Sequence, residues 1–547
     1  MIRINQLKLP LGHDRKDMIE KISRILGVKA EEIDTFNIIK QSIDARKKPD
    51  ILYSYVVDVR VRQISGKKEE KLVQRLRSRD VSVQETICYH LPGHGTAELE
   101  HPPVIIGTGP AGLFCGLMLA RQGYCPVLLE RGEDVDTRTK RVAGFWEGGE
   151  LHPDSNVQFG EGGAGTFSDG KLNTLVKDSF GRNRAVLQIL VEFGADPSIL
   201  YVNKPHIGTD VLSRIVKAMR REIQQLGGQV RFLSRATDFV VEEGRLKAVV
   251  VNGAERIHTR VLVTAIGHSA RDTFEVLWDR GIPMEAKAFA VGLRVQHPQT
   301  LINMSQYAAK ECRELGPASY KVTRQTSGGR GVYSFCMCPG GYVVNASSEQ
   351  GRLAVNGMSY HDRDGENANS AVIVTVTPED FPAKGLFADR EVTGNDTVHP
   401  LAGVAFQREL EQKAYQIAKG NVPVQCFGDF CRNEQSKSLG AVVPQIRGQW
   451  EFANVRSVFP EELAASLEEG IKRMDQKIHG FAREDAVLSG VESRTSSPVR
   501  IWRDEQFKSS VTGLYPCGEG AGYAGGITSA AMDGMKTAEA LIGKFAP

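Results

Sequence analysis

The chain has 547 residues, which is too long for a single hydrophobic core and predicts about three domains. Its hydrophobic content of 41% and charged content of 25% are those of a globular enzyme. No apolar run approaches the roughly 18 residues needed to cross a membrane, and the first residues lack the apolar core of a signal peptide. We therefore expect a cytoplasmic protein without a membrane span.

The cysteine content and the charge narrow the class of protein further. Nine cysteines, an odd number spread over the whole chain, do not resemble a disulfide framework and agree with a reducing compartment. The net charge is +3, and the first 100 residues alone carry 19 Lys and Arg against 15 Asp and Glu, a local excess of +4. The slight basicity therefore belongs to the N-terminal part of the chain.

Residues 1–97 predict a separate N-terminal domain. We expect a strand at residues 2–9, a helix capped by Asp14, strands at 36–43 and 51–61, a charged helix at 67–77 and a strand at 81–87. This βαββαβ order is typical of a ferredoxin-like α+β domain. Residues 90–103, rich in Gly, His and Pro, predict the linker that follows it.

The N-terminal domain carries a group of basic residues: Lys40, Arg46, Lys47, Lys48, Arg60 and Arg62. Clustered positive charge of this kind is one requirement of a nucleic-acid-binding surface. The local excess of +4 is small, however, and strong electrostatic binding needs more. We therefore expect a solvated face on an accessory domain, with nucleic acid not among the partners.

Residues 104–130 form the clearest motif of the chain. A buried strand at 104–106 ends in Gly107, Gly109 and Gly112, a helical pattern follows, and a second strand ends at Glu130. Gly107 makes the strand-to-helix turn, Gly109 lets a pyrophosphate approach the helix N-terminus, and Gly112 brings the helix close to the strand. Glu130, 23 residues after Gly107, is placed to accept hydrogen bonds from a ribose.

This motif has two alternative interpretations. An ordinary βαβ unit that binds nothing is disfavoured because strands, helix and terminal Glu are all in register. A phosphate-binding loop of the Walker type is disfavoured because the motif lacks the Gly-Lys-Ser/Thr ending. The motif therefore favours a dinucleotide site.

Further glycine-rich segments predict other parts of the same site. Five glycines lie within residues 160–170, too many for the interior of an element, so close approach to a ligand is expected. A strand at 261–267 ends in Gly267 and returns the chain to the nucleotide-binding sheet. A short strand, a glycine-lined loop containing Glu519 and a long helix of small residues close the chain.

The remaining segments predict an insertion into the nucleotide-binding domain. Helices at 185–193 and 210–226 and strands at 230–233, 237–242 and 246–251 are expected before it. Within it, we expect an antiparallel sheet from strands at 288–295, 332–336, 342–346 and 372–376, and helices at 405–418 and 460–479. The predicted boundaries are 1–97, 98–283, 284–490 for the insertion, and 491–547.

These segments, in this order, resemble the glutathione-reductase-like FAD/NAD(P)-binding superfamily. More closely, the chain resembles the bacterial FAD-dependent (NAD(FAD)-utilising) dehydrogenase family in the stretches GEGGAGTFSDGKL, PHIGTD, AIGHSARD, FCMCPGGYVV, ESRTSSPVRI and YPCGEGAGYAGGI. The resemblance covers about residues 100–547. It implies an α/β fold in which a Rossmann-like FAD-binding domain (GR2-type) holds an inserted α+β antiparallel-sheet substrate domain.

The resemblance also implies non-covalently bound FAD. The residues it assigns to the cofactor are Gly107, Gly109, Pro110, Ala111, Gly112, Glu130, Arg131, Gly132, Gly162, Gly163, Ala164, Gly165, Thr166, Ala236, Ala265, Ile266, Gly267, Gly518, Glu519, Gly526, Ile527 and Thr528. Ile266 departs from the Thr that is common in the superfamily, at a backbone-contact position. Because only one complete GxGxxG is present, an NAD(P)H or other electron donor is expected to bind elsewhere.

Four residues are candidates for catalysis. Cys336 and Cys338 form a Cys-x-Cys pair that is either a redox relay or a pair of buried structural thiols. His206, like His268, is a candidate acid or base because of its residue type, although a lone His is more often structural. Arg494, like Arg294 and Arg500, is suited either to an anionic substrate or to ordinary ion pairing.

The sequence supports three hypotheses about function. The first is an FAD-dependent oxidoreductase of the dehydrogenase type acting on an unidentified small molecule. The second is a flavin-containing RNA-binding or RNA-modifying protein that uses the N-terminal domain, and the third is a redox-sensing scaffold without turnover. No metal site is expected, because Cys426 and Cys431 lack partners at metal-ligand spacing.

Overall fold

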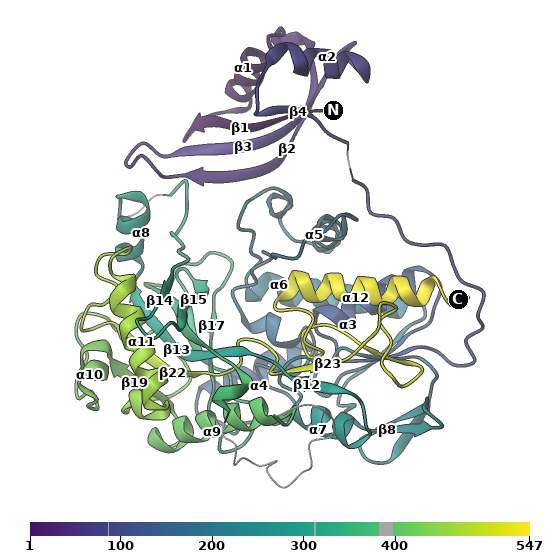
Figure 1. The fold of residues 1–547 in the computed structure, drawn as a ribbon, viewed down its shortest axis with the longest axis vertical. Coiled ribbons are helices and arrows are strands. Elements are labelled where there is room, and N and C mark those ends of the chain that lie inside the picture. The colour runs from purple at the N-terminus through teal and green to yellow at the C-terminus, as the bar shows by residue number, and fades with distance from the viewer. Residues whose placement is uncertain (86, 311–312, 382–397) are drawn as a thin grey trace.

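The computed structural model describes residues 1–85, 87–310, 313–381 and 398–547. It has a mixed α/β fold, as the sequence predicts. Figure 1 shows a small N-terminal domain apart from a larger body, with an extended segment running between them. Among the described residues, no helix combines the length and the apolar character that crossing a membrane requires.

The N-terminal domain is a four-stranded antiparallel sheet in the order β2-β3-β1-β4, with two helices on one face (Figure 1). Its elements are β1 (Ile2–Pro10), α1 (Arg15–Leu26), β2 (Ile33–Asp44), β3 (Leu52–Val61), α2 (Lys67–Leu76) and β4 (Val81–Val83). This is the strand order of the ferredoxin-like arrangement. The last strand stops at Val83 instead of residue 87, and residue 86 lies outside the described residues.

The nucleotide-binding domain is built on a five-stranded parallel sheet in the order β24-β11-β5-β6-β7. The strands are β5 (Val104–Ile106), β6 (Val127–Leu129), β7 (Gln229–Arg231), β11 (Leu262–Thr264) and β24 (Leu514–Pro516). The helices are α3 (Pro110–Arg121), α4 (Val135–Trp146), α5 (Arg182–Glu192), α6 (Thr209–Gln225), α7 (Arg271–Asp279) and α12 (Ile527–Ile542). A small sheet of β8 (Ala236–Glu242), β9 (Arg245–Val251) and β10 (Glu255–His258) is attached to it.

Helix α3 is the most enclosed element of this domain. It packs against α12 and α6, with α12 lying alongside it (Figure 1). Every residue from Ala111 to Ala120 is buried. Gly116 also lets α3 lie close to the sheet, because a Cβ there would lie 3.0 Å from the Leu128 side chain in β6. The N-terminus of α3 is therefore held rigidly at the end of the sheet.

The inserted domain contains a seven-stranded mixed sheet in the order β14-β15-β18-β13-β22-β19-β21. The strands are β13 (Phe289–Pro298), β14 (Thr323–Gln325), β15 (Gly331–Cys338), β18 (Asn367–Val376), β19 (Val422–Cys426), β21 (Trp450–Phe452) and β22 (Val487–Glu492). The helices are α8 (Gln299–Tyr307), α9 (Ala402–Ile417), α10 (Phe427–Arg432) and α11 (Glu461–Met474). The helices expected at 405–418 and 460–479 are thus confirmed as α9 and α11.

One predicted strand lies in a different sheet. Residues 342–346 were expected beside the strands of the large sheet, but β16 (Tyr342–Asn345) lies between β17 (Val355–Met358) and β20 (Ile446–Arg447). Alternation along a strand predicts that it pairs and does not specify its partner. A last pair, β12 (Met284–Ala286) with β23 (Val499–Ile501), lies where the chain enters and leaves the inserted domain.

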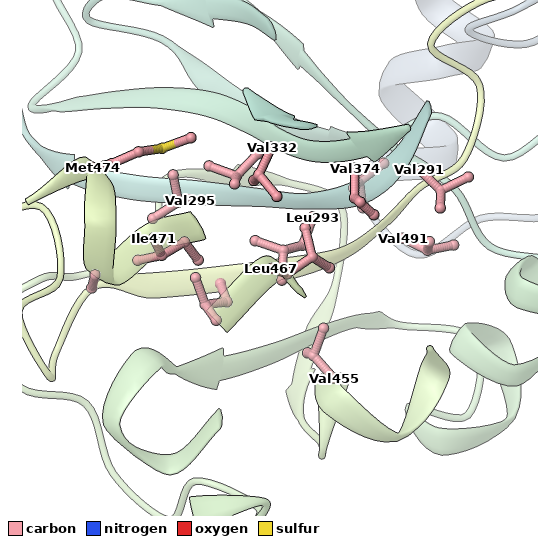
Figure 2. Packing of buried hydrophobic residues seen from close by; sticks show 14 of the residues in the cluster. Val291, Leu293, Val295, Val332, Val374, Val455, Leu467, Ile471, Met474 and Val491 are labelled. Carbon is pink, nitrogen blue, oxygen red and sulfur yellow. The ribbon is translucent and has the colours of Figure 1, made fainter. Parts of the chain in front are cut away.

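The core of the inserted domain is formed where α11 meets the large sheet. Figure 2 shows Leu467, Ile471 and Met474 of α11 against valines and Leu293 of the strands. Gly470 allows this approach, since a Cβ there would lie 2.4 Å from Cγ1 of Val332. Burial of branched side chains on the sheet is the main stabilising contribution at this contact.

Replacing Leu467 by Ala should lower the free energy of unfolding by about 2–5 kcal/mol, because a wholly buried side chain leaves a cavity. Urea unfolding followed by far-UV circular dichroism measures the change. The matched control is Leu175→Ala, whose side chain is 92% exposed. Equal stability of the two variants would contradict this assignment of the core.

Candidate functional site

A cavity of about 310 Å³ lies where the carboxyl ends of β5, β6 and β11 face the inserted domain. This volume is at the lower end of the roughly 300–1,000 Å³ found for ligand pockets. Sixteen of the residues expected to hold the cofactor line it: Gly107, Gly109, Pro110, Ala111, Glu130, Arg131, Gly163, Ala164, Gly165, Ala236, Ala265, Ile266, Gly267, Glu519, Gly526 and Ile527. Segments far apart in sequence are thus brought to one site.

The other six expected residues do not line the cavity, and they are Gly112, Gly132, Gly162, Thr166, Gly518 and Thr528. The structure gives them packing roles. A Cβ on Gly112 would lie 1.9 Å from the Gly107 carbonyl oxygen, and one on Gly132 would lie 2.6 Å from Cα of Gly160. At both positions glycine is needed for contact between backbones, which for Gly112 is the close packing of helix on strand that the sequence predicts.

Four glycines that line the cavity have open space, and no backbone in close contact, where a Cβ would lie. A Cβ on Gly109 would meet only Cα of Gly163, at 3.9 Å, and one on Gly267, Gly525 or Gly526 would meet nothing within 4 Å. Side chains at these positions would fill the cavity. The N-terminus of α3, whose first N–H groups have no intrahelical acceptor, lies beside this space. The cradle therefore fits a long anionic ligand such as a dinucleotide.

Glu130 lines the cavity, but its carboxylate is already used within the protein. One oxygen accepts from the Thr108 N–H at 2.9 Å and from the Thr108 hydroxyl at 2.8 Å. The other accepts from the N–H groups of Gly132 and Gly160, both at 3.0 Å. A carboxylate has about four acceptor positions. Glu130 therefore joins three loops, and a ribose would replace one of these donors instead of meeting a free carboxylate.

Arg138 is a structural residue of the site that the sequence analysis missed. Its guanidinium is wholly buried and donates to the carbonyl groups of Asn156, Val157, Gly160 and Glu161 at 2.7–3.2 Å. Burial lowers the pKa of Arg138 to about 10. The signal was present in the sequence, because Arg138 shares the buried face of α4 with two valines. It fixes the glycine-rich loop that faces the cavity.

Arg494 lines the cavity but is committed to an ion pair. Its Nε and Nη2 donate to the Glu411 carboxylate at 2.9 and 2.8 Å. Arg271 donates to the same carboxylate at 2.7 and 2.9 Å, and both Arg271 and Glu411 are buried. Burial would raise the pKa of Glu411, but the two guanidinium groups lower it. The expected role of Arg494 as a substrate clamp is therefore not the one that the structure shows.

His206, a second catalytic candidate, does not line the cavity. Its ring stacks on that of His361 with centroids 5.6 Å apart, and its Nε2 lies 3.0 Å from the His361 carbonyl oxygen. Burial lowers the pKa of His206 to about 4, so the ring is neutral at neutral pH. His206 therefore belongs to the packing between the two domains.

Among the cysteine candidates, Cys336 lines the cavity and Cys338 does not. Cys338 is fully buried behind it. The inserted domain also contributes Phe335, Asn356 and Glu492 to the lining, none of which the sequence analysis selected. Burial raises the pKa of Glu492, against the opposing effect of Arg294. An acidic residue ending the apolar strand β22 was the available signal for Glu492.

A histidine and a glutamate face each other across the cavity wall. His268 Nδ1 lies 3.6 Å from Glu519 Oε1, and both residues line the cavity. The other ring nitrogen of His268 is buried and has no hydrogen-bond partner among the residues that the structure describes. A buried polar atom of this kind costs stability unless it is paired. It therefore fits a site that a polar ligand completes.

Comparison with protein families gives two matches. Residues 288–495 match the model for the FAD-dependent protein, C-terminal domain-like, family. Residues 1–60 match a domain of unknown function, DUF8436.

Similar solved structures include three chains, each 12% identical to this one. The flavin-dependent brominase Bmp2 covers 80% of this chain and 78% of its own, with a TM-score of 0.36. L-proline dehydrogenase from P. horikoshii covers 81% and 93%, with a TM-score of 0.33. The FrdA chain of E. coli quinol fumarate reductase covers 82% and 70%, with a TM-score of 0.35.

A sequence relative spans the whole chain. It is a Clostridium beijerinckii protein described as uncharacterized, 48% identical over 549 residues, with 100% of this chain and 99% of the relative covered. The chain therefore belongs to the same family as this Clostridium beijerinckii protein.

Proposed function

We propose that this protein is an FAD-dependent oxidoreductase of the dehydrogenase or reductase type, with FAD bound non-covalently in the cavity. The observation that carries the proposal is the glycine cradle at the N-terminus of α3, which opens into a space shared with the inserted domain. FAD supplies the electron transfer when it is bound, and the protein orients the reactants and moves protons.

The residues divide into two groups around the proposed cofactor. The loop from Gly107 to Gly109 and the N-terminus of α3 suit the pyrophosphate, because their N–H groups favour anions. Gly163 to Gly165 and Glu519 to Ile527 suit the ring end, because both segments line the cavity facing the inserted domain. We therefore expect the cofactor and the substrate to share one continuous cavity.

His268 and Glu519 are the groups we assign to proton handling. His268 Nδ1 faces Glu519 Oε1 at 3.6 Å, and its Nε2 needs an acceptor or donor that the described residues do not supply. A histidine in contact with a carboxylate is a common arrangement for holding and releasing a proton near neutral pH. A ligand polar group that hydrogen-bonds Nε2 would complete the pair.

The alternative of an RNA-binding protein has less support from the basic residues of the N-terminal domain. Arg46 and Lys8 both pair with Asp44, at 2.7 and 2.8 Å. Lys48 contacts the Ser305 carbonyl group of the inserted domain. Charges used within the protein are less available to phosphates. We expect no salt-sensitive retention of RNA, and retention that falls steeply with ionic strength would favour this alternative.

Binding of the cofactor can be tested on the purified protein. The purified protein should show flavin absorbance, or acquire it when FAD is added, and the flavin should be released intact on denaturation because no covalent bond is proposed. Anaerobic mixing with NADH and NADPH then tests the electron donor. A colourless protein that takes up no FAD would overturn the proposed function.

Exchange of Glu130 for Arg should reduce FAD affinity at least tenfold, because a cation replaces the acceptor that joins the loops beside the cradle. Fluorescence titration of the apoprotein with FAD measures the affinity. Glu150→Arg makes the same charge change at an exposed position and is the control. Equal affinity in the two variants would show that the adenosine end is bound elsewhere.

Gly525→Leu tests the cradle directly. The new side chain would project into the cavity without backbone strain, so FAD uptake should be lost while the fold is kept. Gly328→Leu is the matched control, since a Cβ there also meets nothing within 4 Å and the residue is away from the cavity. Circular dichroism checks folding of both proteins. Normal FAD binding by the Gly525 variant would place the ligand outside this cavity.

A further inference from the structure

The Cys336–Cys338 segment has an unusual backbone at the cavity wall. Strand β15 pairs with β18 through Phe335 and again through Cys338, with an irregularity between them. Cys336 adopts a φ of +42°, which is uncommon for a residue with a Cβ. Such bulges redirect side chains near functional sites. The result is one cysteine at the cavity and a second directly behind it.

The two cysteines are in contact. The Cys338 thiol donates to the carbonyl oxygen of Cys336 at 3.2 Å. Cys338 is buried, whereas Cys336 is partly exposed. One accessible thiol with a second thiol in reach is the arrangement that a reversible disulfide requires.

Two cations surround this pair. Arg294 donates to the Cys336 carbonyl oxygen at 2.8 Å, and the Lys171 ammonium contacts the Met337 carbonyl group. Lys171 also lines the cavity and pairs with the buried Asp169 at 2.8 Å. An electropositive, partly exposed environment is typical of reactive cysteines.

The electrostatics distinguish the two thiols. The hydrogen bond from Cys338, together with Lys171 and Arg294, lowers the pKa of Cys336 well below its usual value. The hydrogen bond to Cys336, together with burial, raises the pKa of Cys338. Cys336 is therefore the thiol that ionises more readily, and Cys338 the one that keeps its proton. This division is the one expected of an attacking and a resolving cysteine.

We infer that Cys336 and Cys338 form a redox-active dithiol that carries two electrons between the flavin and a low-molecular-weight disulfide. The inference rests on the proposed function, because the flavin is the other electron partner. It names a thiol–disulfide couple as the second substrate class of the site. The position of Cys336, in the cavity that the cofactor residues also line, is what connects the two.

The thiol–disulfide exchange needs no reactant other than the disulfide RSSR and the two cysteines. The Cys336 thiolate attacks one sulfur of the disulfide RSSR, the bond from Cys336 Sγ to that sulfur forms, and RS⁻ leaves. The RS⁻ takes the proton of Cys338, whose sulfur attacks Cys336 Sγ and releases the second RS⁻. The products are a Cys336–Cys338 disulfide, one RSH and one RS⁻. Flavin that a nicotinamide dinucleotide has reduced supplies two electrons, and two protons come from the reduced flavin and water. Both thiols are thereby restored, and one of them then ionises.

Peptide mapping tests the exchange on the full-length protein. Both cysteines lie in one tryptic peptide, residues 331–352, and the control pair Cys426 and Cys431 lies in another, residues 420–432. After anaerobic treatment with 2-hydroxyethyl disulfide, peptide 331–352 should lack two hydrogen atoms while peptide 420–432 keeps both thiols. Two free thiols in peptide 331–352 would overturn the inference.

A second measurement tests the thiolate, first on the unaltered protein and then on two lysine variants. Iodoacetamide should label Cys336 at least tenfold faster than Cys426 at pH 6.5, because only the thiolate reacts. Lys171→Met should shift the labelling profile of Cys336 to higher pH, whereas Lys204→Met, which removes a nearby lysine bonded to Ser319, should shift it less. Equal labelling of Cys336 and Cys426 would overturn the inference.

The electron route is tested separately from the proposed function. Reduction of the flavin by NADH or light should return the oxidised peptide 331–352 to two thiols in the holoprotein and not in the flavin-free protein. A holoprotein whose flavin is reduced while the disulfide persists would overturn the inference and leave the proposed function standing. A protein that takes up no FAD would overturn the proposed function and, with it, the electron route from the flavin, even if the disulfide forms.

Discussion

The site depends on backbone segments that approach more closely than side chains permit. The turn after β5 lies against the end of β11, where a Cβ on Gly107 would meet the Ala265 carbonyl oxygen at 2.4 Å. The glycine-rich loop lies on this turn, since the Gly162 N–H donates to the Thr108 carbonyl group at 2.9 Å. Arg138 then holds the loop from behind through four carbonyl groups. This contact of loop, turn and helix N-terminus forms the glycine cradle that lines the cavity.

Charge within the larger body is buried in pairs and networks. Arg294 donates to Glu492 at 2.7 and 3.1 Å, and Glu411 lies between two arginines. Removing one partner of such a pair leaves an uncompensated charge and costs several kcal/mol, about 3–5. These networks join elements far apart in the chain around the cavity. They therefore set the shape of the cavity wall, where Arg294 also donates to the Cys336 carbonyl oxygen.

The N-terminal domain is tied to the mouth of the same region. The Gln41 N–H in β2 donates to the Tyr201 carbonyl oxygen at 2.7 Å, and the Asn203 N–H donates back to Gln41 at 2.8 Å. Asn173, which lines the cavity, donates to the Asn203 carbonyl oxygen at 2.9 Å. A short chain of hydrogen bonds thus connects the edge of the N-terminal sheet to the cavity. A basic residue of the N-terminal domain makes a further contact with the larger body, because the Lys48 ammonium donates to the Ser305 carbonyl oxygen.

Local patterns by themselves determined most helices and strands, the glycine turn with Glu130, and the mixed α/β class, because each is encoded within a few consecutive residues. Periodicity cannot tell which elements lie opposite each other. The separate sheet of β16, the burial of Arg138 and the pairing of Arg494 with Glu411 therefore came only from the tertiary structure. The same holds for the meeting of Cys336 with Lys171 and Arg294, since long-range packing alone brings residues so distant in the chain to one cavity wall.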